Sequence, residues 1–222
     1  MLEPLTESAY RIDLGVVNAY LVDDGSVTLV DAGTPFRVTT LRRALAAAGY
    51  APSDLDRVVL THYDFDHVGG LAGLGFDGPI FVGAPDAGFV AGTERPPLGN
   101  HKGLLQRLLD PLLDRPSGRI EPLEDGQQVG AFTAVRTPGH TPGHTVYVHE
   151  SLGICFLGDL ARARQGRLTP MPLLLAYSGR ENARSIQAFV AQEFDCRIVA
   201  PGHGDPITDG GAAALTELAQ GV

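Results

Sequence analysis

Four side chains that can bind a metal lie within six positions of the segment THYDFDHVGG: His62, Asp64, Asp66 and His67. Imidazole nitrogens and carboxylate oxygens are common ligands of divalent cations in proteins. Because no Lys or Arg stands near them in the sequence, these groups would repel one another without a bound cation. The segment therefore favours a metal site over its alternative, a solvated polar loop with an aspartate that caps a helix.

Three further segments carry the same residue types at similar places. His140 and His144 lie in TPGHTPGH, Asp159 ends FLGD, and His203 lies in PGHG. Each segment follows an apolar run that is typical of a buried strand, and open α/β sheets place their sites at such strand ends. The joint pattern predicts one metal centre built from four strand ends.

The elements that must position these side chains alternate along the chain, which indicates an α/β layered fold. Strands are predicted at 16–22, 27–32, 57–62, 79–83, 127–137, 144–150, 152–159 and 196–204. Helices are predicted at 35–49, 103–113, 181–194 and 209–220. The region 84–122 differs from the rest by its many prolines, and its leucine-rich part either packs on the core or forms a lid or a dimer contact.

With these motifs in place, the sequence resembles the metallo-β-lactamase superfamily of hydrolases from about residue 17 to residue 204. The superfamily pattern H-x-H-x-D-H falls on residues 62–67, and its later positions fall on His140, Asp159 and His203. The resemblance implies a four-layer αββα sandwich with a two-metal site at one edge of the sheets. We expect residues 1–222 to form one such domain, with a variable insertion or lid at about 84–122.

The resemblance also implies a role for each residue. His62, Asp64 and His140 would hold the first metal, Asp66, His67 and His203 the second, and Asp159 would bridge both. His144 and Asp31 would orient these ligands without binding metal. Asp66 would also hold the attacking hydroxide and move its proton.

One position departs from the family pattern, because Asp64 stands where the superfamily usually has a second histidine. A carboxylate makes the first position richer in oxygen, which shifts its preference toward Fe or Mn. A carboxylate there is similar to the flavodiiron branch, which has Glu at this position. Alternatively, Asp64 binds weakly and leaves the first position partly empty. We expect two divalent ions, Zn in the first instance, with Fe or Mn as alternatives.

The implied reaction is hydrolysis by a hydroxide held between two metals, which polarise the substrate oxygen. The expected substrate is a small ester, thioester or lactone, with the leucines of 104–113 as an apolar wall for an acyl chain. The alternatives are an iron-dependent redox enzyme, similar to sulfur dioxygenases or di-iron proteins, and a phosphodiesterase. A non-catalytic relative is disfavoured because all seven ligand positions carry a suitable residue.

Composition excludes several partners. The 222 residues carry a formal net charge of -9, which disfavours nucleic acid. No apolar run is long enough for a membrane span, and the first residues lack a basic and apolar signal pattern, so we expect a cytoplasmic protein without a membrane partner. A homodimer is possible on sequence grounds, with a small molecule as the substrate. The single lysine, Lys102, among many arginines is attributed to genomic base composition.

The remaining chemically active side chains carry weaker signals. Cys155 and Cys196 each lie in an apolar run, and we expect buried free thiols rather than a disulfide. His101 is expected at the surface, and His149 is expected to face solvent at the end of a strand.

Overall fold

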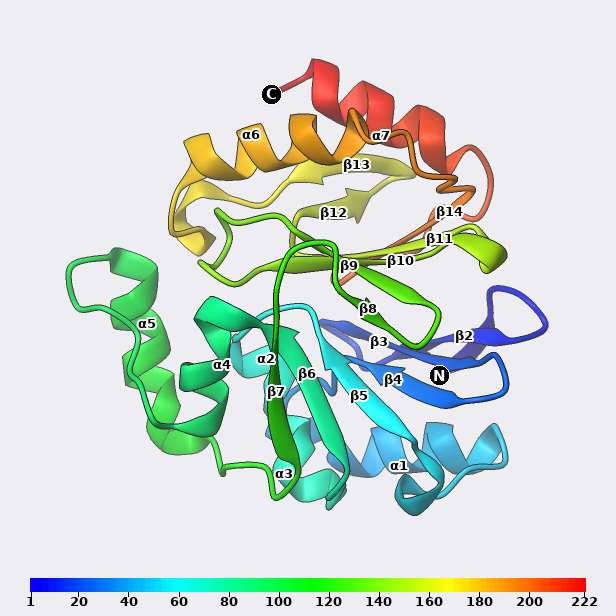
Figure 1. Ribbon diagram of the computed structural model, residues 1–222, viewed down its shortest axis with the longest axis vertical. Coiled ribbons are helices and arrows are strands. Elements are labelled where there is room, and N and C mark those ends of the chain that lie inside the picture. Colours follow the sequence, from blue (N-terminus) through cyan, green and yellow to red (C-terminus); the bar gives the residue numbers. More distant parts are fainter.

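A computed structural model describes residues 1–222, and it consists of two β-sheets packed face to face with helices on both outer sides (Figure 1). The αββα sandwich expected from the sequence is therefore confirmed. The helices are α1 (Val38–Ala47), α2 (Phe65–Val68), α3 (Gly70–Leu74), α4 (Ala84–Ala91), α5 (His101–Leu109), α6 (Gly179–Val190) and α7 (Gly211–Gln220).

The first sheet contains seven strands in sequence order. They are β1 (Leu2–Pro4), β2 (Ala9–Asp13), β3 (Asn18–Asp23), β4 (Val27–Val30), β5 (Arg57–Leu60), β6 (Pro79–Gly83) and β7 (Arg119–Leu123). β1 to β4 are antiparallel, whereas β4 to β7 are parallel. The parallel strands place their carboxyl ends, and the loops that follow them, at one edge.

The second sheet has the order β14-β11-β10-β9-β8. Its strands are β8 (Gln128–Val129), β9 (Phe132–Arg136), β10 (Thr145–His149), β11 (Ile154–Gly158) and β14 (Ile198–Pro201). β11 and β14 are parallel, so the loops after both strands also meet at one edge. β12 (Ala161–Arg164) and β13 (Arg167–Pro170) form a separate hairpin.

The alternation of side chains along each strand divides the core into three layers. Val58 and Leu60 of β5 face the layer that contains Leu41 and Leu45 of α1, whereas Val59 faces the space between the sheets. On the second sheet, Tyr147 faces inward and its neighbours pack against α6 and α7. The central strands, such as β5, β10 and β11, are therefore buried on both faces, which explains their nearly continuous apolar sequences.

The region 84–122 contains parts of both the sandwich and its rim. α4 and β7 belong to the body of the domain, while α5 extends from it beside the open edge (Figure 1). The helix predicted at 103–113 starts at His101 and ends at Leu109, and the next turn, Asp110–Leu112, is a 3-10 helix. Pro111 has no backbone N–H for a continued α-helix.

Two expectations about single residues are wrong. Cys155 of β11 and Cys196, which lies two residues before β14, form a disulfide, and their Cα atoms are 5.4 Å apart. His149 does not face solvent: it is 1% exposed, and its Nε2 lies 2.9 Å from Oδ2 of Asp24. A local strand pattern cannot show either long-range contact. His101 is exposed, as expected.

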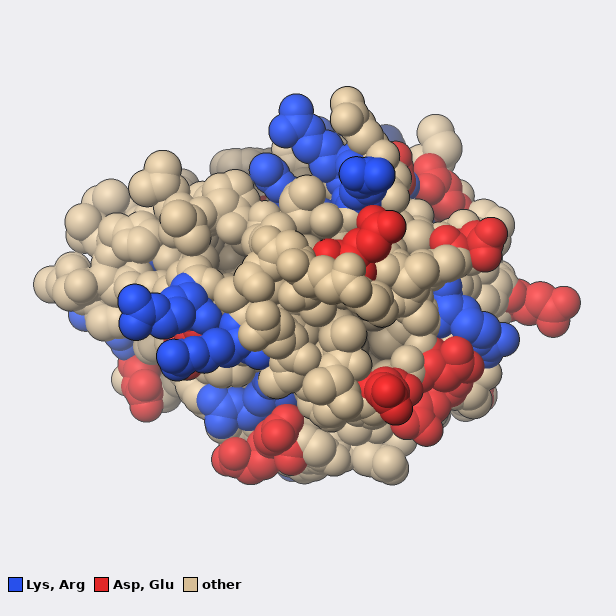
Figure 2. All heavy atoms as spheres, turned by 90° about the horizontal axis from the view of Figure 1, so that it is seen from above, with Lys and Arg blue, Asp and Glu red and all other residues tan.

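No helix combines the length and the apolar character needed to cross a membrane. Charged side chains of both signs are scattered over the face seen in Figure 2. Four leucines of α5 and the turn that follows it are exposed: Leu104, Leu105, Leu108 and Leu112.

Candidate metal centre

The loop after β5 carries four of the predicted ligands to the open edge of the sandwich. His62 and His67 are fully buried at its floor, whereas Asp64 and Asp66 are partly exposed above them. α2 begins at Phe65, so Asp66 and His67 lie in one helical turn directly after Asp64. This short turn is what lets neighbours in sequence point to two separate positions.

The first group of converging side chains contains His62, Asp64, His140 and Asp159. Oδ2 of Asp64 lies 3.3 Å from Nε2 of His62 and 3.0 Å from Nε2 of His140. Nε2 of His140 is also 3.2 Å from Oδ2 of Asp159. Three strand ends, those of β5, β9 and β11, thus meet at this point.

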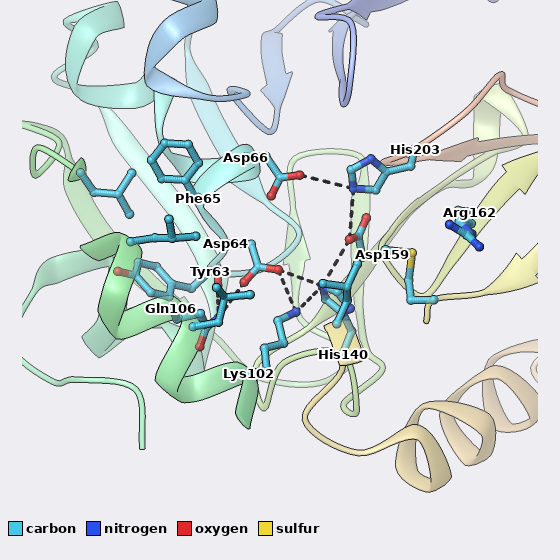
Figure 3. Close-up of a pocket in the computed structure, with 15 residues that line it drawn as sticks. Tyr63, Asp64, Phe65, Asp66, Lys102, Gln106, His140, Asp159, Arg162 and His203 are labelled. Atoms are coloured by element: carbon cyan, nitrogen blue, oxygen red, sulfur yellow. Dashed lines mark hydrogen bonds and ion pairs between the residues drawn. The ribbon is translucent and has the colours of Figure 1, made fainter. Parts of the chain in front are cut away.

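The second group contains Asp66, His67 and His203. Nε2 of His203 lies 3.5 Å from Oδ2 of Asp66 and 3.3 Å from Oδ2 of Asp159 (Figure 3). Nε2 of His67 lies 3.4 Å from Oδ1 of Asp159. Asp159 therefore stands between the two groups, and its role as a ligand shared by two metals, which the resemblance implies, stays a prediction.

The donor atoms fit a bound divalent ion. Two ligand atoms at about 2.0–2.1 Å from one tetrahedral metal lie about 3.3 Å apart, close to the separations in both groups. In addition, Nε2 of His62, Nε2 of His67 and Oδ1 of Asp159 are buried and make no hydrogen bond. Buried polar atoms normally have partners, so these three indicate a missing one. Metal binding by the seven residues remains a prediction.

Asp31 fixes the orientation of one histidine and supports a second. Its Oδ2 lies 2.8 Å from Nδ1 of His67 and accepts a hydrogen bond from Oγ1 of Thr61 at 2.7 Å. Oγ1 of Thr61 in turn lies 2.9 Å from Nδ1 of His62. With both Nδ1 atoms engaged, both Nε2 atoms are turned toward the centre. The backbone of Asp31 adopts the left-handed conformation, with a φ of 58°.

His144 supports the centre from behind. Its Nε2 accepts a hydrogen bond from the backbone N–H of Asp159 at 3.0 Å, and its Nδ1 lies 2.8 Å from Oγ1 of Thr137. Both ring nitrogens are therefore used within the protein. His144 belongs to neither group of converging atoms, and its position agrees with the supporting role expected from the sequence.

Asp86 is a structural residue of the site that the sequence analysis did not find. It is fully buried at the start of α4, where it accepts hydrogen bonds from the N–H of Tyr63, the N–H of Gly143 and the hydroxyl of Thr141. One carboxylate thus joins the loop after β5 to the loop before β10. Burial raises the pKa of Asp86 to about 6, although the three hydrogen bonds oppose this shift.

Lys102 contradicts the expectation that no basic residue neutralises the acids. This residue of α5 is 2% exposed, and its Nζ lies 2.7 Å from Oδ2 of Asp64. One helical turn later, Nε2 of Gln106 donates to Oδ1 of Asp64 at 2.7 Å (Figure 3). The tertiary fold creates these contacts over about forty residues, so proximity in sequence could not show them. That Lys102 is the only lysine was the available signal.

The electrostatics of the centre keep its acids ionised. Burial raises the pKa of Asp64, but Lys102 and two histidines outweigh it and hold that pKa well below its usual range. Burial likewise opposes ionisation of Asp159, yet His203, His67 and His140 lower its pKa well below the ordinary value. Burial lowers the pKa of His62 well below its ordinary value, which favours the neutral ring that a metal requires.

A cavity of about 260 Å³ opens directly above the two groups. Its floor is polar and includes Asp64, Asp66, His140, Asp159 and His203. Its walls are largely apolar and include Tyr63, Phe65, Leu105, Leu109, Leu113, Met171 and Leu175. The side chains in Figure 3 come from α2, α5, β12 and the loops that follow strands of both sheets, and α5 forms one wall of the cavity. The cavity is therefore apolar beside α5 and polar at its floor.

Comparison with known proteins agrees with this fold. The family model described as the metallo-beta-lactamase superfamily matches residues 12–203. The probable metallo-hydrolase YqjP of Bacillus subtilis is 28% identical over 88% of this chain and 69% of its own length. A hydroxyacylglutathione hydrolase of Cupriavidus taiwanensis is 32% identical over 70% of this chain and 54% of its own length.

A solved structure agrees in fold. The crystal structure of a metallo-beta-lactamase family protein from Thermus thermophilus matches with a TM-score of 0.74 and 24% identity, over 98% of this chain and 80% of that one.

Proposed function

Because this chain belongs to the metallo-β-lactamase superfamily, we propose that it is a metal-dependent hydrolase of a small ester, thioester or lactone. The observation that carries the proposal is the position of two groups of metal-binding atoms at the floor of one apolar cavity. The similarity to a hydroxyacylglutathione hydrolase supports a thioester among these substrates.

We propose two metal positions that share Asp159. His62, Asp64 and His140 belong to the first, and Asp66, His67 and His203 belong to the second. Divalent ions bound there would supply an activated water at neutral pH and polarise the substrate carbonyl. Three imidazoles in the fully buried part of the site favour zinc, and the carboxylates leave iron or manganese as alternatives.

The residues of the chain have separable tasks in this reaction. Asp66 is half-buried and lines the cavity, so Oδ2 is placed to take the proton of the attacking water and to pass it to the leaving group. Asp31 and His144 hold the histidine and aspartate side chains in place through the hydrogen bonds described above. Leu105, Leu109 and Leu113 would bind the acyl part of the substrate and exclude water from it.

The proposed partner is therefore a small molecule rather than a nucleic acid. The net charge of -9 opposes a phosphate backbone, and the charges in Figure 2 form no continuous basic face. The cavity volume of about 260 Å³ suits the acyl part of a metabolite.

An iron-dependent redox reaction is the alternative, because Asp64 adds an oxygen ligand to the first position. Both carboxylate oxygens of Asp64 are, however, engaged by Lys102 and Gln106. The oxygen-rich character that would favour iron is thereby reduced. The hydrolase proposal thus has the stronger support.

A substrate panel tests the proposal. Zinc-loaded protein is assayed with acyl thioesters, aryl esters, lactones and a phosphodiester, and iron-loaded protein is assayed for oxygen uptake with a thiol persulfide. We expect turnover of at least one carbonyl class, and its loss in Asp159→Ala. Turnover of the phosphodiester alone, or persulfide-dependent oxygen uptake without hydrolysis, would refute the proposal.

A further inference from the structure

One face of α5 is directed at a single carboxylate of the metal centre. Lys102 and Gln106 are four residues apart and therefore lie on the same side of the helix. Nζ of Lys102 is 2.7 Å from Oδ2 of Asp64, and Nε2 of Gln106 is 2.7 Å from Oδ1. Both oxygens that Asp64 would offer to a metal are thus in contact with one helix.

The ammonium of Lys102 also contacts a second ligand atom of the first group. Nζ lies 2.5 Å from Nε2 of His140, the same nitrogen that is 3.0 Å from Oδ2 of Asp64. The lone pairs that accept from the ammonium are those that a metal would use. An ammonium has no lone pair of its own and repels a divalent ion, so both cannot hold these two atoms at once.

The second group has no such competitor. No Lys or Arg forms an ion pair with Asp66 or Asp159, and Asp66 is open to the cavity. Nε2 of His67 is buried without a hydrogen bond. The two metal positions therefore differ, because Lys102 contacts ligand atoms of the first and no Lys or Arg pairs with the carboxylates of the second.

α5 is attached to the domain mainly by hydrogen bonds, which include Nε2 of Gln106 to the carbonyl of Tyr63 and Nε of Arg107 to the carbonyl of Pro96. Oδ1 of Asn100 accepts from the N–H of Lys102 and caps the helix, while Nδ2 of Asn100 donates to the carbonyl of Tyr177. The hydroxyl of Tyr177 donates to Oε1 of Gln106. The buried residues of α5 are Lys102, Gly103 and Gln106, so the helix buries no large apolar side chain that would oppose its movement.

We propose that Lys102 and a metal ion compete for the first position, so that the second position fills tightly and the first fills only when α5 releases Asp64. This inference rests on the metal centre of the proposed function. It makes Lys102 a positioning residue that couples the metal content of the centre to the wall of the substrate cavity. Metal binding at the first position would then open or rearrange that wall.

Zinc titration of chelator-treated protein tests the inference, because it shows whether replacing Lys102 strengthens or weakens zinc binding at the weaker position. Isothermal calorimetry of the wild type should show two binding events whose affinities differ by about tenfold or more. In Lys102→Met, the weaker event should tighten by about tenfold or more, and the tighter event should stay unchanged. If Lys102 were instead a metal ligand, the variant would bind more weakly. If it were a bystander, nothing would change. Either result would overturn the competition.

Arg43→Met is the control, because it removes one positive charge at an exposed residue of α1 that forms no ion pair and does not line the cavity. Its zinc affinities should equal those of the wild type. If Lys102→Met fails to fold, Lys102→Gln removes the charge and keeps a polar side chain, and the same tightening is expected from it.

Hydrogen exchange reports the movement of α5 independently of calorimetry. Amides of residues 101–109 should lose protection at the zinc concentration that fills the weaker position of the wild type, whereas unchanged protection would contradict the release of Asp64. The two proposals fail differently: absence of any zinc binding would refute the metal centre itself, whereas two events of equal affinity in the wild type would refute only the competition.

Discussion

Nδ1 of His67 lies 2.8 Å from Oδ2 of Asp31, and this contact turns Nε2 of the same ring toward Asp159. Asp31 is buried and adopts a left-handed backbone conformation that non-glycine residues rarely use. The surrounding structure therefore holds it in an unfavourable backbone conformation at the one place where its carboxylate reaches both His67 and Thr61. The relationship links the end of β4 to the metal-binding loop after β5.

Replacing this carboxylate should weaken metal binding. Asp31→Asn keeps the shape of the side chain but removes the charge that orients and polarises His67. We expect zinc affinity at the tighter position to fall by about 10- to 100-fold, measured by competition with a chromogenic chelator. Asp24→Asn is the matched control, because Asp24 pairs with His149 outside the centre. If the zinc affinity of Asp31→Asn equalled that of Asp24→Asn, Asp31 would not act through His67.

The apolar wall should determine preference for acyl-chain length. Leu109→Ala removes a side chain that lines the cavity, so KM for a long-chain substrate should rise by about fivefold to tenfold, with little change for an acetyl substrate. Leu108→Ala, on the exposed side of the same helix, should leave both unchanged. Steady-state kinetics with substrates that differ only in acyl-chain length measures these changes in KM. A wall that does not contact the acyl chain would show parallel changes for all chain lengths.

Asp86 should contribute strongly to stability. Asp86→Ala leaves the N–H groups of Tyr63 and Gly143 buried without their acceptor, which costs about 2–4 kcal/mol in the free energy of unfolding. Urea denaturation measures the loss. Asp114→Ala, which alters an exposed carboxylate, should cost almost nothing. A variant of Asp86 with wild-type stability would show that the hydrogen bonds do not hold the two loops.

The disulfide should stabilise the second sheet. Cys155 and Cys196 are separated by 41 residues, and closing a loop of that size contributes about 2–4 kcal/mol. The double variant Cys155→Ala/Cys196→Ala should unfold at correspondingly lower denaturant. Thiol titration of denatured, unreduced wild type should find no reactive thiol. Two reactive thiols would instead support the free cysteines expected from the sequence.

The alternation of strands and helices, and the strand ends that carry the converging side chains, were accessible from the sequence because both depend on local pattern, whereas the four-layer arrangement was implied by the family resemblance. The run RVVL followed by His62 defines a buried strand and its end, and the same holds for FLGD and Asp159. The contacts of Lys102, Gln106 and Asp86 were not accessible. Each depends on how a helix outside the predicted motifs packs over the loops, and their spacing in the chain carries no periodic signal. The expectation of free thiols at Cys155 and Cys196 was wrong for the same reason, because their pairing depends on the order of strands in the second sheet.

The most direct test of the metal-dependent hydrolase follows its activity and its metal content together. Chelator-treated protein is titrated with zinc while hydrolysis of the best substrate from the panel and the bound zinc are measured on the same samples. We predict that activity rises with bound zinc from a background about 10³-fold lower, and that His67→Ala stays at that background while retaining the wild-type circular dichroism spectrum. Full activity in the metal-free protein, or an unchanged kcat in His67→Ala, would contradict the proposed function.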